Sequence, residues 1–420
     1  MTTQTSAEEA GFSSDQVHHE TFGEAVRTYL QRVRGGDMGS LPAVLGLAVL
    51  VAIFGAANGT FLTALNIANL VTQAGAICVL ALGLVFVLLL GDIDLSAGVA
   101  GGVSASVAAL AIADHSQNWL VAVVLGTLVG ALIGLLIGVL VAYLGIPSFV
   151  VTLAFFLALQ GVTLKLIGEG GSVRVADPVL RGLTIDNVPV LWGWISAVGI
   201  MVVYALLAFR RYSKQVAEGL QHAPLGIVVA KIGGLTAVVL GATAVLNSNR
   251  SLNPNFPIQG IPYVLPVVGV LLIVSTFVLT RTAYGRHIYA VGGNAEAARR
   301  AGIRVNSIRV SVFVICSALA AISGIIAASN AGGVSTSSGA GNTLLYAVGA
   351  AVIGGTSLFG GRGRAQDAVI GGLVIATIAN GLGLLNQASY INFLVTGGVL
   401  LLAASVDAIS RRRRSASGLG

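Results

Sequence analysis

Charged residues are scarce in this 420-residue chain: they make up 9% of it, whereas an ordinary soluble protein carries roughly 25%. Cysteine is almost absent, and Cys78 and Cys316 both fall inside apolar runs. A disulfide framework or a cysteine-based metal site is therefore not expected. The five histidines lack metal-ligand spacing. These absences exclude an ordinary soluble protein, and no metal or other cofactor is predicted.

Catalytic motifs are absent as well. None of the lysines Lys165, Lys214 and Lys231 follows a glycine, so the chain has no P-loop. Neither H-E-x-x-H nor G-x-S-x-G occurs. Asp92 and Asp94, two residues apart, would point to different faces of a helix and not form a catalytic pair. The sequence therefore predicts a protein that is not an enzyme.

Apolar residues dominate the chain instead. They make up 55% of it, the mean hydropathy is +0.91, and apolar runs recur along nearly its whole length. A run of about 20 residues crosses a hydrocarbon core as a helix. We predict an all-α, polytopic transmembrane helical bundle of about ten to twelve spans. They are placed at 41–57, 67–90, 96–113, 119–143, 148–167, 190–209, 224–246, 261–280, 308–329, 343–358, 366–386 and 390–408.

The basic residues predict the orientation of these spans. We expect a cytoplasmic tail over 1–40, a transmembrane domain over 41–409 with a cytoplasmic basic loop at 281–309, and a basic cytoplasmic tail over 410–420. The positive-inside rule agrees with this layout, although the layout places Arg174 and Arg181 on the extracytoplasmic side of the membrane. The net charge of +7 is spread beside the spans and forms no stripe that would bind nucleic acid.

A short helix is predicted inside the basic loop, over 294–302. Asn294 can cap its start, Glu296 lies in the first turn, Arg299 and Arg300 lie in the last turn, and Gly302 suits a left-handed residue after the end. The small residues Ala297 and Ala298 would let another protein approach the helix. We therefore expect a docking element; the alternative is a solvated loop that only fixes topology.

Four glycines in the run 119–143 share one helical face: Gly126, Gly130, Gly134 and Gly138. Their G-x-x-x-G spacing allows close approach of a second helix backbone. We expect them to pack helices within one subunit, in preference to forming a dimer.

Two glycine-containing breaks interrupt the apolar runs. The first holds Asp92, Asp94 and Ser96, and ionisable groups at membrane depth are costly and commonly functional. Ser96 could cap the helix that follows. The alternative is an ordinary cytoplasmic turn with solvated carboxylates. The second break, 354–364, lies in a comparable place late in the chain and hints at an internal repeat.

Amides are the other polar groups in the apolar runs. They donate and accept hydrogen bonds without needing a counter-charge, which suits a neutral polyhydroxylated solute; hydrogen bonds between helices are the alternative. The candidates for a substrate path are these amides, the polar residues of the first break, and the threonine that follows Pro147. They are Asn69, Gln73, Asp92, Asp94, Ser96, Thr152 and Asn380.

Four stretches of the chain resemble a known family. They are Gly83–Gly98, with Asp92-Ile-Asp-Leu-Ser; Ile146–Leu153; Arg281–Ile303, with Glu296-Ala-Ala and Gly302; and Val352–Gly361. The chain resembles permease subunits of bacterial sugar ABC importers of the ribose, arabinose and xylose group, and is most like the xylose permeases. The resemblance covers roughly residues 60–408.

The resemblance implies a permease that moves a monosaccharide, a pentose such as xylose, across the bacterial plasma membrane by alternating access. It implies a cytoplasmic ABC ATPase that docks at Glu296–Gly302, an extracytoplasmic sugar-binding protein and a second permease copy, in a homodimer or a heterodimer. The alternative is an ion- or proton-coupled secondary transporter that uses Asp92 and Asp94. The sequence does not select the sugar.

Overall fold

The computed structural model describes residues 39–220, 224–251, 253 and 255–416. The chain divides into two compact units. The described part of the smaller unit, 194–220 and 224–243, contains most of helices α8 (Val190–Ala217) and α9 (Leu225–Asn247). The expected tail over 1–40 lies outside the described residues, apart from its last two.

The larger unit holds the remaining apolar helices: α2 (Leu41–Ala57), α3 (Ala64–Leu89), α4 (Ala97–Ala113), α5 (Trp119–Ala142), α6 (Ser148–Ile167), α10 (Val264–Arg281), α13 (Val305–Ala331), α14 (Thr343–Gly354), α15 (Ala365–Leu384) and α16 (Ser389–Ala416). Over the described residues of both units, nine helices are long and apolar enough to cross a membrane, and α2, α4 and α14 are shorter apolar helices. The predicted helical bundle is confirmed, and each expected run matches one helix.

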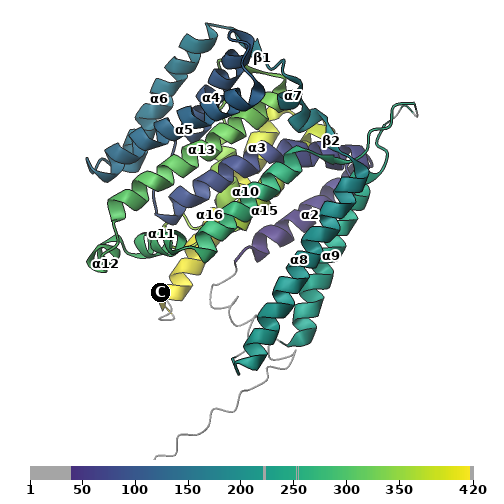
Figure 1. Ribbon diagram of the computed structural model, residues 1–420, viewed down its shortest axis with the longest axis vertical. Helices are drawn as coiled ribbons and strands as arrows, with labels where there is room; N and C mark the ends of the chain where they lie inside the picture. The colour runs from purple at the N-terminus through teal and green to yellow at the C-terminus, as the bar shows by residue number, and fades with distance from the viewer. Residues whose placement is uncertain (1–38, 221–223, 252, 254, 417–420) are drawn as a thin grey trace, which may run out of the picture. The chain divides into compact units, whose positions relative to one another are not determined.

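Helix α13 is the centre of the larger unit. It packs on α5, α3 and α4, as Figure 1 shows for its course beside α5. The glycines of α5 let the two backbones approach closely: a Cβ on Gly130 would lie 2.6 Å from the Ser317 carbonyl oxygen, and one on Gly138 would lie 2.8 Å from the Val310 Cα. A Cβ on Gly126 would lie 2.8 Å from the Ser104 carbonyl oxygen of α4. These glycines therefore pack helices within one chain.

Short strands gather at one end of this unit, which we call the strand end. There β1 (Ser172–Arg174) pairs antiparallel with β4 (Gly333–Ser335), and β2 (Asn187–Val188) pairs with β3 (Ile261–Pro262). The short helix α7 (Pro178–Ile185) lies between β1 and β2 in the chain and packs with the ends of α4 and α13. Asp177 caps its start by accepting hydrogen bonds from the backbone N–H groups of Val179 and Leu180.

The opposite end, which we call the loop end, holds two further helices and a glycine loop. The helices are α11 (Ala283–Gly293) and α12 (Ala295–Arg300), and the loop is 355–364, between α14 and α15. Only α12 was expected. Residues 281–293 were expected to be part of the basic loop, but Ile288 and Val291 are buried and make one face of α11 apolar. At the C-terminus, α16 continues through the start of the expected basic tail as far as Ala416.

The shorter helices α4 and α14 begin close to one another. A Cβ on Gly98, in the first turn of α4, would lie 2.6 Å from the Gly339 carbonyl oxygen and 3.5 Å from the backbone nitrogen of Leu344, in α14. A Cβ on Gly101 would lie 2.5 Å from the carbonyl oxygen of Ala320, about halfway along α13. The irregular backbone at Gly339, which is partly buried, therefore contacts the first turn of α4 directly. Non-helical backbone at membrane depth is tolerated only where it is buried in protein or lines a water-filled cavity.

The glycine packing predicts a stability difference between two alanine variants. In Gly134→Ala, the new methyl group would overlap the backbone at Phe313 and Val314, whereas Gly161 of α6 has open space at the Cβ position. Overpacking of this kind costs about 1–3 kcal/mol. We expect the melting temperature of the detergent-purified protein to fall for Gly134→Ala and to be unchanged or slightly raised for Gly161→Ala. Equal melting temperatures would contradict the close packing.

Candidate functional site

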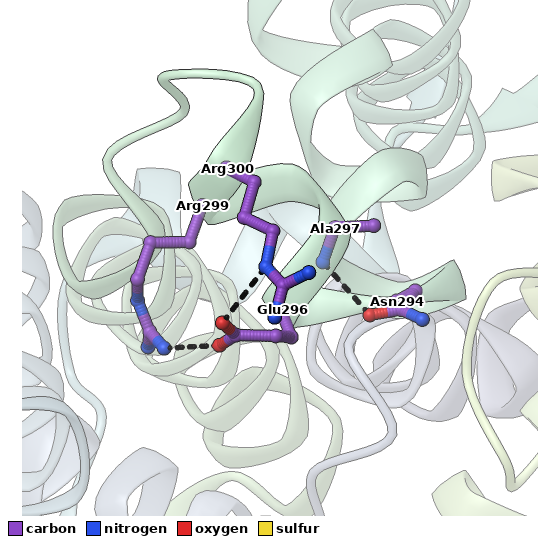
Figure 2. A network of polar contacts seen from close by, with 5 residues as sticks. All are labelled: Asn294, Glu296, Ala297, Arg299 and Arg300. Atoms are coloured by element: carbon purple, nitrogen blue, oxygen red, sulfur yellow. Dashed lines mark hydrogen bonds and ion pairs between the residues drawn. The ribbon is translucent and has the colours of Figure 1, made fainter.

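Helix α12 presents a compact polar network at the loop end (Figure 2). Asn294 Oδ1 accepts a hydrogen bond from the Ala297 N–H at 2.9 Å, which caps the start of the helix. Glu296 accepts from Arg299 at 2.8 Å and forms a looser contact with Arg300 at 3.4 Å. Gly302 adopts a left-handed φ of +84° just after the helix. The helix expected over 294–302 is thus present, with a cap at its start and a glycine beyond its end.

The structure corrects the position of Ala298. A docking surface was expected at this small residue, but only 4% of it is exposed, and it belongs to the buried core of the larger unit. At helical spacing, Ala298 and its neighbours on the same face must point inward when the opposite face carries Glu296 and the two arginines. Exposed residues that a partner can reach are Asn294, Glu296, Ala297, Arg299, Arg300, Ala301 and Gly302.

Asp92 lies in the break between α3 and α4 and is 8% exposed. Its Oδ2 atom is 3.4 Å from Nε of Arg309, in the first turns of α13. Neither atom has a hydrogen-bond partner within the described part of the chain, so the contact is an ion pair without good hydrogen-bond geometry. The guanidinium thus opposes the cost of burying the carboxylate.

Asp94 is completely buried, together with Ser96 and Thr152. Its Oδ1 atom accepts hydrogen bonds from the Ser96 hydroxyl at 2.6 Å and from the Ser96 N–H at 2.9 Å, directly before α4. The Thr152 hydroxyl donates to the Ser148 carbonyl oxygen at 2.9 Å, and the Ile93 carbonyl oxygen lies 3.3 Å away. The alternative of a solvated turn is therefore wrong, because both carboxylates of this break are buried.

The three amide candidates do not join this cluster. Asn380 pairs with Asn66 through two reciprocal amide hydrogen bonds of 2.9 and 3.0 Å, which tie α15 to α3. Asn69 and Gln73 lie on the exposed face of α3 in the single chain. The structure thus brings together Asp92, Asp94, Ser96 and Thr152, and it leaves Asn69, Gln73 and Asn380 elsewhere.

The partner of Asp92 was not predicted from the sequence. Arg309 is the last residue of the expected basic loop, and a contact with the 90–96 break was not expected. A signal for its role was available, because a carboxylate next to a span requires a counter-charge, and Arg309 lies at the start of an apolar run. What the sequence did not supply was the packing of α13 against the break.

The long apolar helices define a multi-pass helical membrane protein. Residues 66–404 match the family model described as "Branched-chain amino acid transport system / permease component". The chain therefore belongs to this permease family. No solved structure matches it.

Curated relatives narrow the class within this family. A xylose transport system permease protein of Haemophilus influenzae is 34% identical over 88% of this chain and 96% of its own length. Its counterpart in Escherichia coli K12 is 37% identical over 87% and 91%, and the ribose import permease protein of Escherichia coli K12 is 31% identical over 87% and 92%. The chain is a sugar ABC importer permease, a multi-pass protein of the bacterial inner membrane.

The Asp92–Arg309 pair predicts a characteristic response to mutation. Arg309→Gln leaves a buried carboxylate without its counter-charge, and an unsatisfied buried polar group costs about 1–3 kcal/mol. We expect this variant to have a lower melting temperature than wild type in detergent. The double variant Asp92→Asn, Arg309→Gln should recover most of the loss because no buried charge remains. A double variant that melts as low as Arg309→Gln alone would show that the pair does not hold the break.

Proposed function

We propose that this chain moves a pentose, with xylose as the first candidate, by alternating access driven by a separate ATPase subunit. The observation that carries the proposal is α12, a short helix that is capped at its start, exposed on its polar face and joined through Ala298 to the core of the spans. The names of the relatives support xylose, since two of those reported transport xylose and one imports ribose.

Helix α12 is the proposed docking site for that ATPase. Its exposed residues Glu296, Ala297, Arg299 and Arg300 combine small and charged side chains. Gly302 ends the element in a left-handed conformation that most residues reach only at a cost of roughly 1–2 kcal/mol. A short helix with fixed ends can pass force from a partner to the spans, whereas a frayed segment would absorb it.

The buried cluster of Asp92, Asp94, Ser96 and Thr152 is the proposed part of the sugar path, close to the meeting point of α4 and α14. Asn69, Gln73 and Asn380 remain secondary candidates, and Asn380 would have to leave its pair with Asn66 in order to bind sugar. An extracytoplasmic binding protein and a second permease copy complete the proposed assembly; the family resemblance supports both.

Uptake in a bacterial strain without its own pentose transporters tests the proposal. Radiolabelled xylose should enter only when the chain, the ATPase and the binding protein are expressed together, and uptake should persist when an uncoupler collapses the proton gradient. Unlabelled xylose should compete better than ribose or arabinose. Uptake by the chain alone, abolished by the uncoupler, would instead establish the proton-coupled alternative at Asp92 and Asp94.

A docking variant provides a control for the same assay. Ala297→Trp places bulk on the exposed face of α12 and should abolish co-purification of the ATPase, while the permease still inserts. Ala113→Trp adds the same bulk to an exposed alanine at the strand end and should retain the ATPase. ATPase association that survives in Ala297→Trp would move the docking site away from α12.

We further propose that the loop end faces the cytoplasm, as the arginines around α11 and α12 favour. Single cysteines test this directly because native Cys78 and Cys316 are fully buried. Ala301→Cys should be protected from a membrane-impermeant thiol reagent in intact cells and react in inverted vesicles. Ala113→Cys, at the strand end, should show the opposite pattern. Labelling of Ala301→Cys from outside the cell would reverse the topology.

A further inference from the structure

Three backbone segments meet at the loop end in a contact that we call the glycine junction. It consists of Leu89 and Gly91 at the end of α3, Gly292 in the last turn of α11, and Gly360 and Gly361 in the loop 355–364. The Gly361 N–H donates a hydrogen bond of 2.8 Å to the Leu89 carbonyl oxygen. One of the free carbonyl groups at the end of α3 is thereby satisfied by a loop far away in the sequence.

No side chain separates the segments of the junction. A Cβ on Gly292 would overlap the Leu89 carbonyl oxygen and lie 2.9 Å from the Gly361 nitrogen. A Cβ on Gly360 would lie 2.9 Å from both the Gly292 carbonyl oxygen and the Gly91 nitrogen. Gly91, Gly360 and Gly361 have φ values of +75°, +83° and +72°, which favour glycine. Backbone atoms in direct contact have no rotamers through which to yield, so displacement of one segment displaces the others.

Helix α11 connects rigidly to α12 through one shared residue. The Asn294 N–H donates to the Ala290 carbonyl oxygen at 3.0 Å, and the Asn294 carbonyl oxygen accepts from the Ala298 N–H at 2.9 Å. Asn294 therefore closes the end of one helix while its side chain caps the start of the next. No flexible linker lies between the exposed face of α12 and the glycine junction.

Tyr289 forms a second attachment between α11 and the loop 355–364. Its hydroxyl donates a hydrogen bond of 2.7 Å to the Gly363 carbonyl oxygen. Burial raises the pKa of Tyr289, and the Asp367 carboxylate raises it further against the opposing effect of Arg364. The phenol therefore remains protonated and able to donate near neutral pH.

We propose that Gly292 is a positioning residue of the transport cycle. When α12 is displaced, the contact of Gly292 with Leu89 and Gly361 transmits that displacement to both breaks in the bundle. The inference rests on the proposed function. One break, 90–96, leads into α4, and the other, 355–364, follows α14. Since Gly98 of α4 lies against Leu344 at the start of α14, one displacement at the junction acts on both shorter helices.

Adjacent glycines in α11 provide a matched test. Gly292→Ala introduces a methyl group into the junction, whereas Gly293 is exposed and its Cβ position is open. We expect Gly292→Ala to insert and bind the ATPase, and the assembled complex to hydrolyse ATP at the basal rate. The maximal rate of xylose uptake should fall about tenfold, equivalent to about 1.4 kcal/mol in the barrier. The half-saturating xylose concentration should not change. Gly293→Ala should transport like wild type.

Two tyrosine variants decide the case if Gly292→Ala fails to insert. Tyr289→Phe removes the hydrogen bond to Gly363, and Tyr284→Phe removes one from α11 to Ser311 of α13, which is not part of the junction. We expect a lower maximal uptake rate, with ATPase binding retained, for Tyr289→Phe relative to Tyr284→Phe. Equal rates for these two variants would then overturn the proposal.

The failure of this inference is distinguishable from failure of the proposed function. If wild-type uptake does not depend on the ATPase, the proposed function itself is wrong. If it does depend on the ATPase and Gly292→Ala transports like Gly293→Ala, the junction does not transmit displacement. Loss of ATPase binding in Gly292→Ala would also overturn the proposal, because Gly292 would then act on docking.

Discussion

Direct contact between backbones at glycine is the constraint on which the larger unit depends. Helix α13 can touch α5 along its length only because Gly126, Gly130, Gly134 and Gly138 present no side chains to their neighbours. In a bilayer, where apolar side chains gain little by leaving lipid, such close packing supplies much of the attraction between helices. The same kind of contact recurs where α4 meets α14 and where α3 meets α11 and the loop 355–364.

The two breaks give this close-packed bundle its polar interior. Each break interrupts apolar helices, and the two touch at Gly91 and Phe359, where a Cβ on the glycine would lie 3.3 Å from the phenylalanine carbonyl oxygen. Asp94 sits at the start of α4, where the helix dipole favours negative charge. Asp92 instead has a cation from α13 beside it. Two neighbouring carboxylates are thus held in the interior by different means.

Most of the helices could be predicted from the sequence because membrane spans are set by length and apolarity alone. The ends of α12 were also predictable, since capping by Asn294 and the left-handed Gly302 depend on local sequence. Contacts between segments that are distant in the sequence could not be predicted. Burial of Ala298, the pairing of Asp92 with Arg309 and the Asn66–Asn380 amide pair all depend on which helices become neighbours. No local pattern carries that information.

The hydrogen bond that closes α3 has a consequence for the order of synthesis. The Leu89 carbonyl oxygen receives its partner only after residue 361 has been made, and Asn66 must wait still longer for Asn380. Strand β1 likewise remains unpaired until β4 follows, more than a hundred residues later. The early helices therefore enter the membrane with polar groups that only the last third of the chain can satisfy. The spans are synthesised one after another, but the contacts that complete the bundle can form only when the polypeptide is nearly complete.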